Sequence, residues 1–152
     1  MNQSDDDRHI HKRHSKTMLL YHIVFPVKFR RSVLTPEIEH SLVQICQEIS
    51  ERFEIHFVEI GSDINHIHYL VQSIPNLSVS DIVRTIKSIT AKQLFKRHPD
   101  LKKELWGGHI WTSGYYANTV GQYGNEVAIK KYIEKQSAHY QQIMSNQLTL
   151  FT

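Results

Sequence analysis

The stretch that most constrains this chain is residues 63–71, which read Asp-Ile-Asn-His-Ile-His-Tyr-Leu-Val. Its apolar and β-branched residues predict a buried strand. Residues two apart on a strand point to the same face, so His66 and His68 should project together, about 6–7 Å apart. Two imidazoles on one rigid face can hold a metal ion. The strand therefore indicates a paired-histidine site.

The spacing of the two histidines is weak evidence by itself. The chain has 11 histidines in 152 residues, and chance alone then gives about one His-x-His. His9 and His11 have the same spacing in a polar tail. The assignment therefore depends on the rest of the chain.

Composition favours a single domain that is large enough to bury a core without disulfides. Cys46 is the only cysteine, which excludes a disulfide framework or a cysteine zinc site and fits a reducing cytoplasm. No apolar run approaches the roughly 20 residues of a membrane span, and no signal-peptide pattern opens the chain. We therefore expect a cytoplasmic protein without membrane contact.

The chain divides into a core and two short ends. Residues 1–16 are expected to be a disordered arm, 17–145 the domain and 146–152 a tail. Residues 5–14 have three acids against three basic residues, so the net charge of +3 belongs to the rest of the chain. That charge permits nucleic-acid binding without establishing it.

Hydrophobic periodicity predicts the order of elements. We expect a strand over 17–29, a helix after Thr35-Pro36 with an apolar stripe that reaches Phe53, and a strand over 54–60. In that strand Glu59 should share a face with Ile55 and Phe57. A turn at 61–63 then leads into the histidine strand.

A capping box at Ser78–Asp81 starts a second helix that Pro99 ends, with Ile82 and Ile86 inward. Next we expect a strand over 109–120, interrupted near Gly114. The last element is a helix from Asn125 to about Met144, with Tyr140 and Ile143 on its apolar stripe. The pattern is an α+β, ferredoxin-like βαββαβ antiparallel sheet with an added C-terminal helix.

Basic and aromatic residues suggest where single strands could bind. The candidate basic residues are Lys28, Arg30, Arg31, Arg84 and Lys87, the last two on the outward face of the second helix; a solvated surface is the alternative. The candidate stacking residues are Trp111, Tyr115 and Tyr116, for which burial in the core is the alternative. No helix-turn-helix or zinc-finger pattern is present to read duplex DNA.

Tyr132 and Gln136 stand one turn apart in the last predicted helix. At i and i+4 their β-carbons are about 5–6 Å apart on one face. A tyrosine nucleophile beside an amide ligand has chemical meaning if both face His66 and His68. From spacing alone, a half-buried helix aromatic explains Tyr132 more simply.

Four motifs together resemble the single-tyrosine HUH transposases of small bacterial insertion sequences that move as single-stranded DNA. They are Tyr21-His22-Ile23-Val24-Phe25 with Lys28-Phe29-Arg30-Arg31, Asp63-x-x-His66-Ile67-His68, Thr119-Val120-Gly121, and Tyr132-Ile133-x-x-Gln136. They occur in the family's order over roughly residues 20–136.

The resemblance implies a role for each matching residue. It makes His66, His68 and Gln136 the ligands of a divalent ion and Tyr132 the nucleophile that forms a 5′-phosphotyrosine. It also implies a homodimer that recognises DNA hairpins at element ends, in which the tyrosine acts in cis or in trans.

A metal fits this chemistry, because a free tyrosine has a pKa near 10 and is a poor nucleophile at neutral pH. Two imidazoles and an amide favour zinc or another transition ion, whereas the resemblance implies Mg²⁺ or Mn²⁺, with Mn²⁺ the easier fit. Asp63, Glu59 and His22 are candidate bases for the phenolic proton. No Walker-type loop is present, so no nucleotide cofactor is expected.

Two other functions remain open at this point. One is a domesticated relative that binds structured single-stranded nucleic acid without cleaving it, since ferredoxin-like sheets commonly bind nucleic acid. The other is a metal-binding regulator unrelated to DNA.

Overall fold

The computed structural model describes residues 19–105, 107–120, 131, 135 and 139–146. The predicted arm at 1–16, Tyr132 and Gln136 lie outside the described residues. Of the predicted tail, only Asn146 is described.

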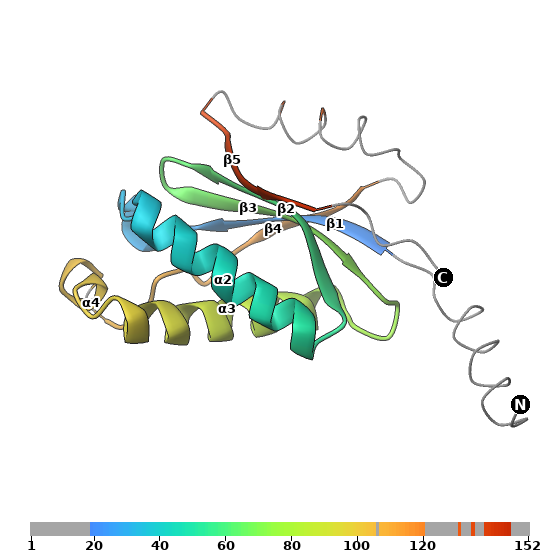
Figure 1. Ribbon diagram of the computed structural model, residues 1–152, viewed down its shortest axis with the longest axis horizontal. Coiled ribbons are helices and arrows are strands. Elements are labelled where there is room, and N and C mark those ends of the chain that lie inside the picture. The colour runs from blue at the N-terminus through green and yellow to red at the C-terminus, as the bar shows by residue number, and fades with distance from the viewer. Residues whose placement is uncertain (1–18, 106, 121–130, 132–134, 136–138, 147–152) are drawn as a thin grey trace, which may run out of the picture.

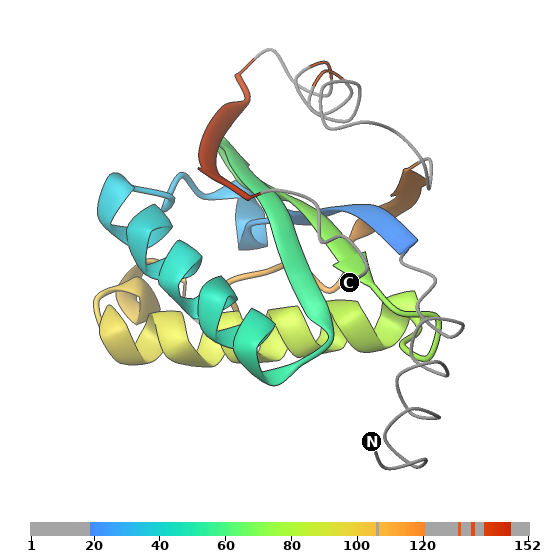
Figure 2. The same cartoon turned by 45° about the vertical axis from the view of Figure 1, so that its right-hand side comes forward.

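The protein is an antiparallel sheet with two long helices on one face (Figure 1). The strands occur in the spatial order β4-β1-β3-β2-β5, so that β4 and β5 form opposite edges (Figure 2). In chain order the elements are β1 (Leu19–Pro26), the 3₁₀ turn η1 (Lys28–Arg30), α2 (Pro36–Arg52), β2 (Ile55–Asp63), β3 (His66–Ser73), α3 (Val79–Arg97), α4 (Leu101–Glu104), β4 (Tyr116–Val120) and β5 (Gln141–Ser145). The first four strands with α2 and α3 confirm the predicted α+β, ferredoxin-like βαββαβ order.

Both long helices start at the predicted caps. The Thr35 hydroxyl accepts a hydrogen bond from the Ile38 amide at 3.3 Å, directly before Pro36. At α3 the Ser78 hydroxyl accepts from the Asp81 amide at 3.0 Å, while the Asp81 carboxylate accepts from the Ser78 amide at 3.2 Å. This is the reciprocal capping box that satisfies two amides at a helix start.

The two faces of the sheet differ in chemistry, and β3 shows the difference most clearly. Ile67, Tyr69 and Val71 are buried in the main core that α2 and α3 cover. The alternate residues of β3 point to the other face, where Leu70 packs with Leu20 and Val58 in a separate small cluster. We call this second face, which also carries His66 and His68, the histidine face.

The turn predicted at 61–63 is wrong. Gly61, Ser62 and Asp63 belong to β2, and Asp63 pairs directly with His66. The turn is formed instead by Ile64 and Asn65. Gly61 pairs with His68, and the Tyr140 ring occupies the space that a β-carbon at Gly61 would need. The glycine therefore marks a close contact, and the hairpin is longer than its sequence suggests.

The face predicted for Glu59 is also wrong. A register shift between Phe57 and Glu59 forms a β-bulge, so Phe57 pairs with Val71 whereas Glu59 pairs with Leu70. A bulge inserts one extra residue and exchanges the faces of the residues that follow. Ile60 consequently enters the main core, and Glu59 lies on the histidine face.

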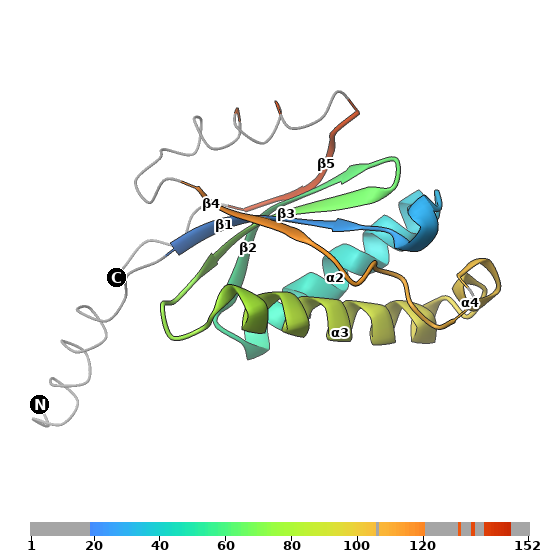
Figure 3. The ribbon, with the colours of Figure 1, turned by 180° about the vertical axis from the view of Figure 1, so that it is seen from behind.

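The first and fourth strands are shorter than predicted. The first ends at Pro26 and leads into η1 rather than continuing to residue 29. In the predicted strand over 109–120, only 116–120 is regular, and Trp111 makes an isolated bridge with Val27. The interruption predicted near Gly114 is confirmed, and there the Lys87 ammonium binds three successive carbonyls of residues 112–114. Figure 3 shows this connection passing beside α3 on its way to β4.

The predicted end of the last helix near Met144 is wrong. Residues 141–145 form β5, which pairs antiparallel with β2. The free edge of β2 offers unpaired backbone groups, and Met144 is buried in the main core. Tyr140 and Ile143 therefore do not share a helical stripe. A helical hydrogen bond from the Lys135 amide to the Lys131 carbonyl, 3.2 Å long, is described in the segment before it.

Candidate active site

The paired histidines occupy adjacent positions at one end of the histidine face. His66 begins β3 opposite Pro26 of β1, and His68 lies opposite Val24. His68 is 6% exposed, whereas His66 is only partly buried. The period of the strand thus places both imidazoles on one face, as predicted, and the structure shows that this is the face away from α2 and α3.

A third histidine contacts this pair. His22 of β1 is 1% exposed and lies opposite Leu70, which makes it a diagonal neighbour of His68. Its Nε2 is 3.1 Å from the His68 Nδ1. The two rings stack with centroids 5.3 Å apart and planes inclined by 10°. His22 and His68 thus form a hydrogen-bonded imidazole pair.

The histidines are neutral at physiological pH. Burial, together with the smaller effect of the neighbouring His68, lowers the pKa of His22 to about 4. Burial likewise lowers the pKa of His68 to about 4, against an opposing effect of Asp63. The pKa of His66 is lowered by burial and by Arg30, again opposed by Asp63. Neutral imidazoles retain a lone pair for a cation.

Arg30 contacts the exposed side of the pair. One of its guanidinium nitrogens is hydrogen bonded to the His66 Nε2. A guanidinium has donors and no acceptor, so His66 uses the Nε2 lone pair in this contact. That lone pair is also one that a metal ion can use.

The backbone that delivers Arg30 is unusual. Phe29 and Arg30 both adopt positive φ angles, 59° and 54°, a region that residues with a β-carbon rarely enter and that often marks functional sites. The Arg30 carbonyl accepts a 3.5 Å hydrogen bond from the side-chain amide of Asn65 in the β2–β3 turn. This hydrogen bond holds Arg30 beside the hairpin tip that carries His66.

These groups line one pocket of about 570 Å³. Its lining residues are His22, Val24, Pro26, Arg30, Asp63, His66, His68 and Tyr116. It brings together three histidines, one arginine and one carboxylate. Such a set suits a phosphate group and a cation.

Glu59 and Tyr140 close the far side of His68. The Tyr140 hydroxyl donates a 2.6 Å hydrogen bond to a Glu59 carboxylate oxygen. The Tyr140 ring meets the His68 ring edge to face, with centroids 5.4 Å apart. With the bulge in β2, all three candidate bases, Asp63, Glu59 and His22, lie on the histidine face.

The described residues fit a divalent ion in part. The neutral imidazoles of His66 and His68 are suitable donors. Within the described ranges, however, no group of three or more His, Cys, Asp or Glu side chains could hold a metal by itself. A site here needs ligands from elsewhere, and Gln136 lies outside the described residues.

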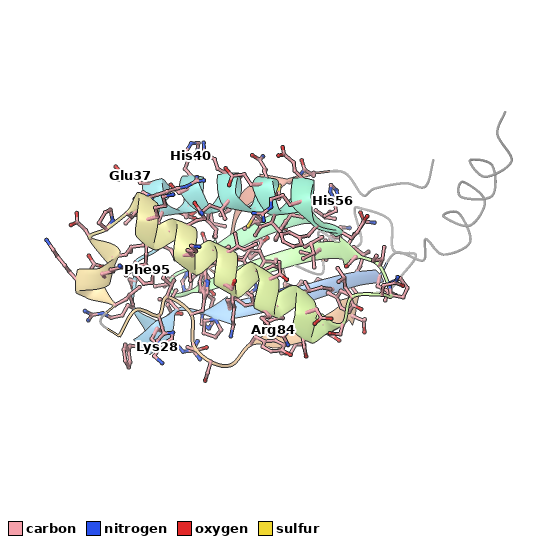
Figure 4. The ribbon with its side chains drawn as sticks, turned by 90° about the horizontal axis from the view of Figure 1, so that it is seen from below. Lys28, Glu37, His40, His56, Arg84 and Phe95 are labelled. Atoms are coloured by element: carbon pink, nitrogen blue, oxygen red, sulfur yellow. The ribbon has the colours of Figure 1, made fainter. Side chains whose placement is uncertain are left out.

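The five candidate DNA-binding residues separate into different surroundings. Arg30 lines the histidine pocket, whereas Lys28 and Arg84 line a second pocket of about 490 Å³ beside α3, and both lie along one side of that helix in Figure 4. Arg31 donates to the Glu104 carbonyl at 3.3 Å. Lys87 does not point outward as predicted, because it is partly buried and its ammonium binds three backbone carbonyls.

The three candidate stacking aromatics also differ. Trp111 is 5% exposed, and its indole donates a 2.9 Å hydrogen bond to the Thr90 hydroxyl, so it is a core residue. Tyr115 and Tyr116 are exposed. Tyr116 also lines the histidine pocket.

Tyr140 contacts the site, although the helical pattern of its segment does not predict this. Its assignment to a helical stripe concealed its contact with His68. Gly61 was the available signal, because an isolated glycine in a strand often marks a close approach by another group. Here that group is the Tyr140 ring.

Comparison with known proteins decides the family. The family model described as "Transposase IS200 like" matches residues 15–136. The ISDra2 transposase TnpA of Deinococcus radiodurans is 32% identical over 118 residues, which cover 78% of this chain and 84% of the relative. This chain belongs to the IS200-like transposase family. A transposase for insertion sequence element IS200 of Salmonella typhimurium is 31% identical over 123 residues, covering 81% of this chain and 80% of the relative.

Solved structures agree with the fold of this IS200-like transposase. A crystal structure assigned to a transposase of Deinococcus radiodurans R1 superposes with a TM-score of 0.64 and 30% identity, covering 80% of this chain and 92% of that one. A REP-associated tyrosine transposase bound to a REP hairpin has a TM-score of 0.50 and 11% identity, with 76% and 62% coverage. This second likeness concerns the fold alone. Across the described part of the transposase, no helix is long and apolar enough to span a membrane.

Proposed function

We propose that this IS200-like transposase is a metal-dependent, single-tyrosine strand transferase that cleaves and rejoins single-stranded DNA at insertion-sequence ends. The main structural support is the pocket in which the neutral His66 and His68 lie beside the Arg30 guanidinium. Tyr132 is the proposed nucleophile, on the strength of its motif and the family.

The reaction conserves the phosphodiester. The Tyr132 phenolic oxygen attacks the scissile phosphorus and forms a new phosphorus–oxygen bond, while the bond to the 3′-oxygen breaks. The phenolic proton leaves to a base, and the departing 3′-oxygen takes up a proton as a hydroxyl. Attack by the 3′-hydroxyl of another strand then reverses these bond changes and releases Tyr132.

His66, His68 and Gln136 are the proposed protein ligands of a Mg²⁺ or Mn²⁺ ion. When bound, such an ion polarises the scissile phosphate and stabilises charge that develops during displacement. Arg30 adds a fixed positive charge beside the same pocket. Phosphate oxygens and water supply the hard ligands that these ions prefer.

Hairpins at the element ends are the proposed substrate. The REP-associated neighbour is bound to a hairpin, which supports this choice by analogy of fold. Lys28, Arg31 and Arg84 are the proposed phosphate contacts outside the histidine pocket; Lys87 is not among them, since its ammonium is used within the fold. We further propose that the enzyme acts in the cytoplasm as a homodimer.

A covalent-adduct assay tests the function. Full-length protein is mixed with a labelled single-stranded element end and Mn²⁺, and the adduct is resolved by denaturing electrophoresis. Tyr132→Phe should abolish the adduct, because phenylalanine lacks the attacking oxygen. Tyr69→Phe is the matched control: its hydroxyl is buried in the main core and has no hydrogen-bond partner within the described part of the chain.

Tyr140→Phe provides a competing arm of the same assay. Tyr140 is a described tyrosine whose ring contacts His68. An adduct that persists in Tyr132→Phe and disappears in Tyr140→Phe would transfer the nucleophile's role to Tyr140. Tight hairpin binding without any adduct in the parent protein would instead support the domesticated, non-cleaving binder.

A further inference from the structure

His22 contacts the proposed metal ligand His68 directly, and the proposed reaction names it only as one of three candidate bases. It lies on β1 rather than on the histidine strand, and both it and His68 are almost fully buried. Its contact with His68 joins Nε2 of one ring to Nδ1 of the other at 3.1 Å. The contact therefore constrains which nitrogen of His68 carries the proton.

Only one of two arrangements of this hydrogen bond leaves His68 able to bind a cation through Nε2. A neutral imidazole has one N–H and one lone pair. If the His22 Nε2 donated, the His68 proton would reside on Nε2, and that nitrogen could not act as a ligand. If the His68 Nδ1 donates to His22, the His68 Nε2 keeps its lone pair.

We propose that His22 is a positioning residue that accepts the Nδ1 proton of His68, and so fixes both the tautomer and the ring orientation in which His68 binds a divalent cation through Nε2. This inference rests on the proposed function of His66 and His68 as ligands. A hydrogen bond to the second nitrogen of a liganding imidazole commonly serves this purpose. Here the partner is a neutral imidazole, instead of the more usual carboxylate or backbone carbonyl.

The opposite contact on His66 gives a consistent result. Arg30 can only donate to the His66 Nε2, so the neutral His66 also carries its proton on Nδ1. Both members of the pair then carry their lone pair on Nε2, and on His66 a cation would take the place of the Arg30 donor. His22 selects this nitrogen on His68 by accepting from Nδ1, and Arg30 selects it on His66 by donating to Nε2.

The contact also distinguishes positioning from direct ligation. The His22 Nε2 faces the His68 Nδ1. In the proposed tautomer His68 coordinates through its other nitrogen, Nε2. Among the residues that the structure describes, His22, His66 and His68 do not form a three-ligand group. His22 therefore acts through His68 and is not itself a proposed ligand.

Nitrogen NMR on the metal-free, full-length protein tests the tautomer directly. With ¹⁵N-labelled histidine, two-bond correlations separate the Nδ1–H and Nε2–H tautomers, and the spectrum of His68→Asn identifies the His68 signals. We expect His68 as the Nδ1–H tautomer. The Nε2–H tautomer would overturn the proposal.

Manganese binding to His22 variants provides the second measurement. Electron paramagnetic resonance gives the Mn²⁺ affinity of the parent, His22→Leu and His22→Gln, because the glutamine amide oxygen can replace the acceptor at Nε2. We expect a loss of about 10–100-fold for His22→Leu and a loss of about threefold or less for His22→Gln. His40→Leu, on the outer side of α2 (Figure 4), is the control for loss of a histidine elsewhere.

The outcomes separate this proposal from the proposed function. Parental affinity in His22→Leu would overturn the positioning role while leaving the metal site intact. Absence of Mn²⁺ binding in the parent would contradict the metal-dependent function, and the tautomer spectrum would still decide the His22–His68 contact. Should His22→Leu fail to fold, the glutamine variant and the parental spectrum remain decisive.

Discussion

The two faces of the sheet use the same strands for different purposes. On the helix-covered face, Ile67, Tyr69 and Val71 are buried among apolar neighbours. On the histidine face, alternate positions carry His66 and His68, and the nearby strands add the buried polar His22 and Glu59. Hydrophobic burial stabilises one face, whereas buried polar groups on the other must be matched by specific partners. The difference predicts that adjacent residues of β3 have separable effects on stability and on activity.

The largest expected effect comes from His68→Asn. Asparagine keeps a polar atom close to the position of Nδ1, where it can still meet His22, and removes Nε2. We expect Mn²⁺ affinity to fall by more than about 100-fold, because loss of a ligand exceeds the usual effect of losing a ligand's partner. The thermal midpoint should change little. Unchanged Mn²⁺ affinity would show that His68 on the histidine face does not bind the metal.

Ile67→Ala should instead lower stability and leave Mn²⁺ affinity unchanged. Truncation of a fully buried isoleucine leaves a cavity and costs about 2–5 kcal/mol of unfolding free energy. Denaturant titration measures this loss. Mn²⁺ affinity of the folded fraction should stay at the parental level; a large drop would show that the two faces are not separable.

Gly61→Ala tests the contact between β2 and Tyr140. The new β-carbon would overlap the Tyr140 ring, so we expect a loss of about 1–3 kcal/mol from overpacking. The same substitution made in a Tyr140→Ala background should cost much less. Equal costs in both backgrounds, measured by a double-mutant cycle, would argue against the close packing.

Lys87→Met and Arg84→Met form a matched pair on α3. Removing the ammonium that binds the carbonyls of 112–114 should cost about 1–3 kcal/mol and speed amide exchange in that segment. The exposed Arg84 should instead affect affinity for single-stranded DNA at low salt, with little change in stability. If Lys87→Met instead lowered DNA affinity without changing stability, Lys87 would again be a candidate DNA contact.

The smallest effect concerns the start of α3 and depends on pH. Hydrogen bonds from Ser78 lower the pKa of Asp81 below its ordinary value of 3.8, so the ionised carboxylate favours the folded state. This contribution is complete above the ordinary value and is lost as pH falls through the lowered pKa. The stability difference between the parent and Asp81→Asn should therefore shrink in acid. A difference that is independent of pH would show that the carboxylate charge has no part.

Local patterns in the sequence predict the helix-covered face well. The caps at Thr35 and Ser78 and the buried positions of α2 follow from interactions within a few residues. The histidine spacing on β3 follows from strand period. Phe53 is an exception, because α2 ends at Arg52 and leaves it 37% exposed.

The features that the sequence could not predict depend on long-range contacts. Pairing with β2 converts residues 141–145 from predicted helix to strand. Lys87 needs carbonyls more than twenty residues away, and Tyr140 meets Glu59 across most of the chain. No local pattern encodes these partners. The contact between His22 and His68 likewise depends on the register of β1 against β3.

The bulge in β2 has a consequence for how this chain is aligned with its relatives. Asn146 binds the carbonyls of Phe57 and Val58 through its side-chain amide and backbone amide, so the extra residue is supported by the chain's own C-terminal segment. Deleting Val58 would restore uninterrupted alternation and leave Glu59 opposite Leu70 on the histidine face. A one-residue gap at this point in an alignment therefore signals the loss of the bulge, and the carboxylate that follows it keeps its face.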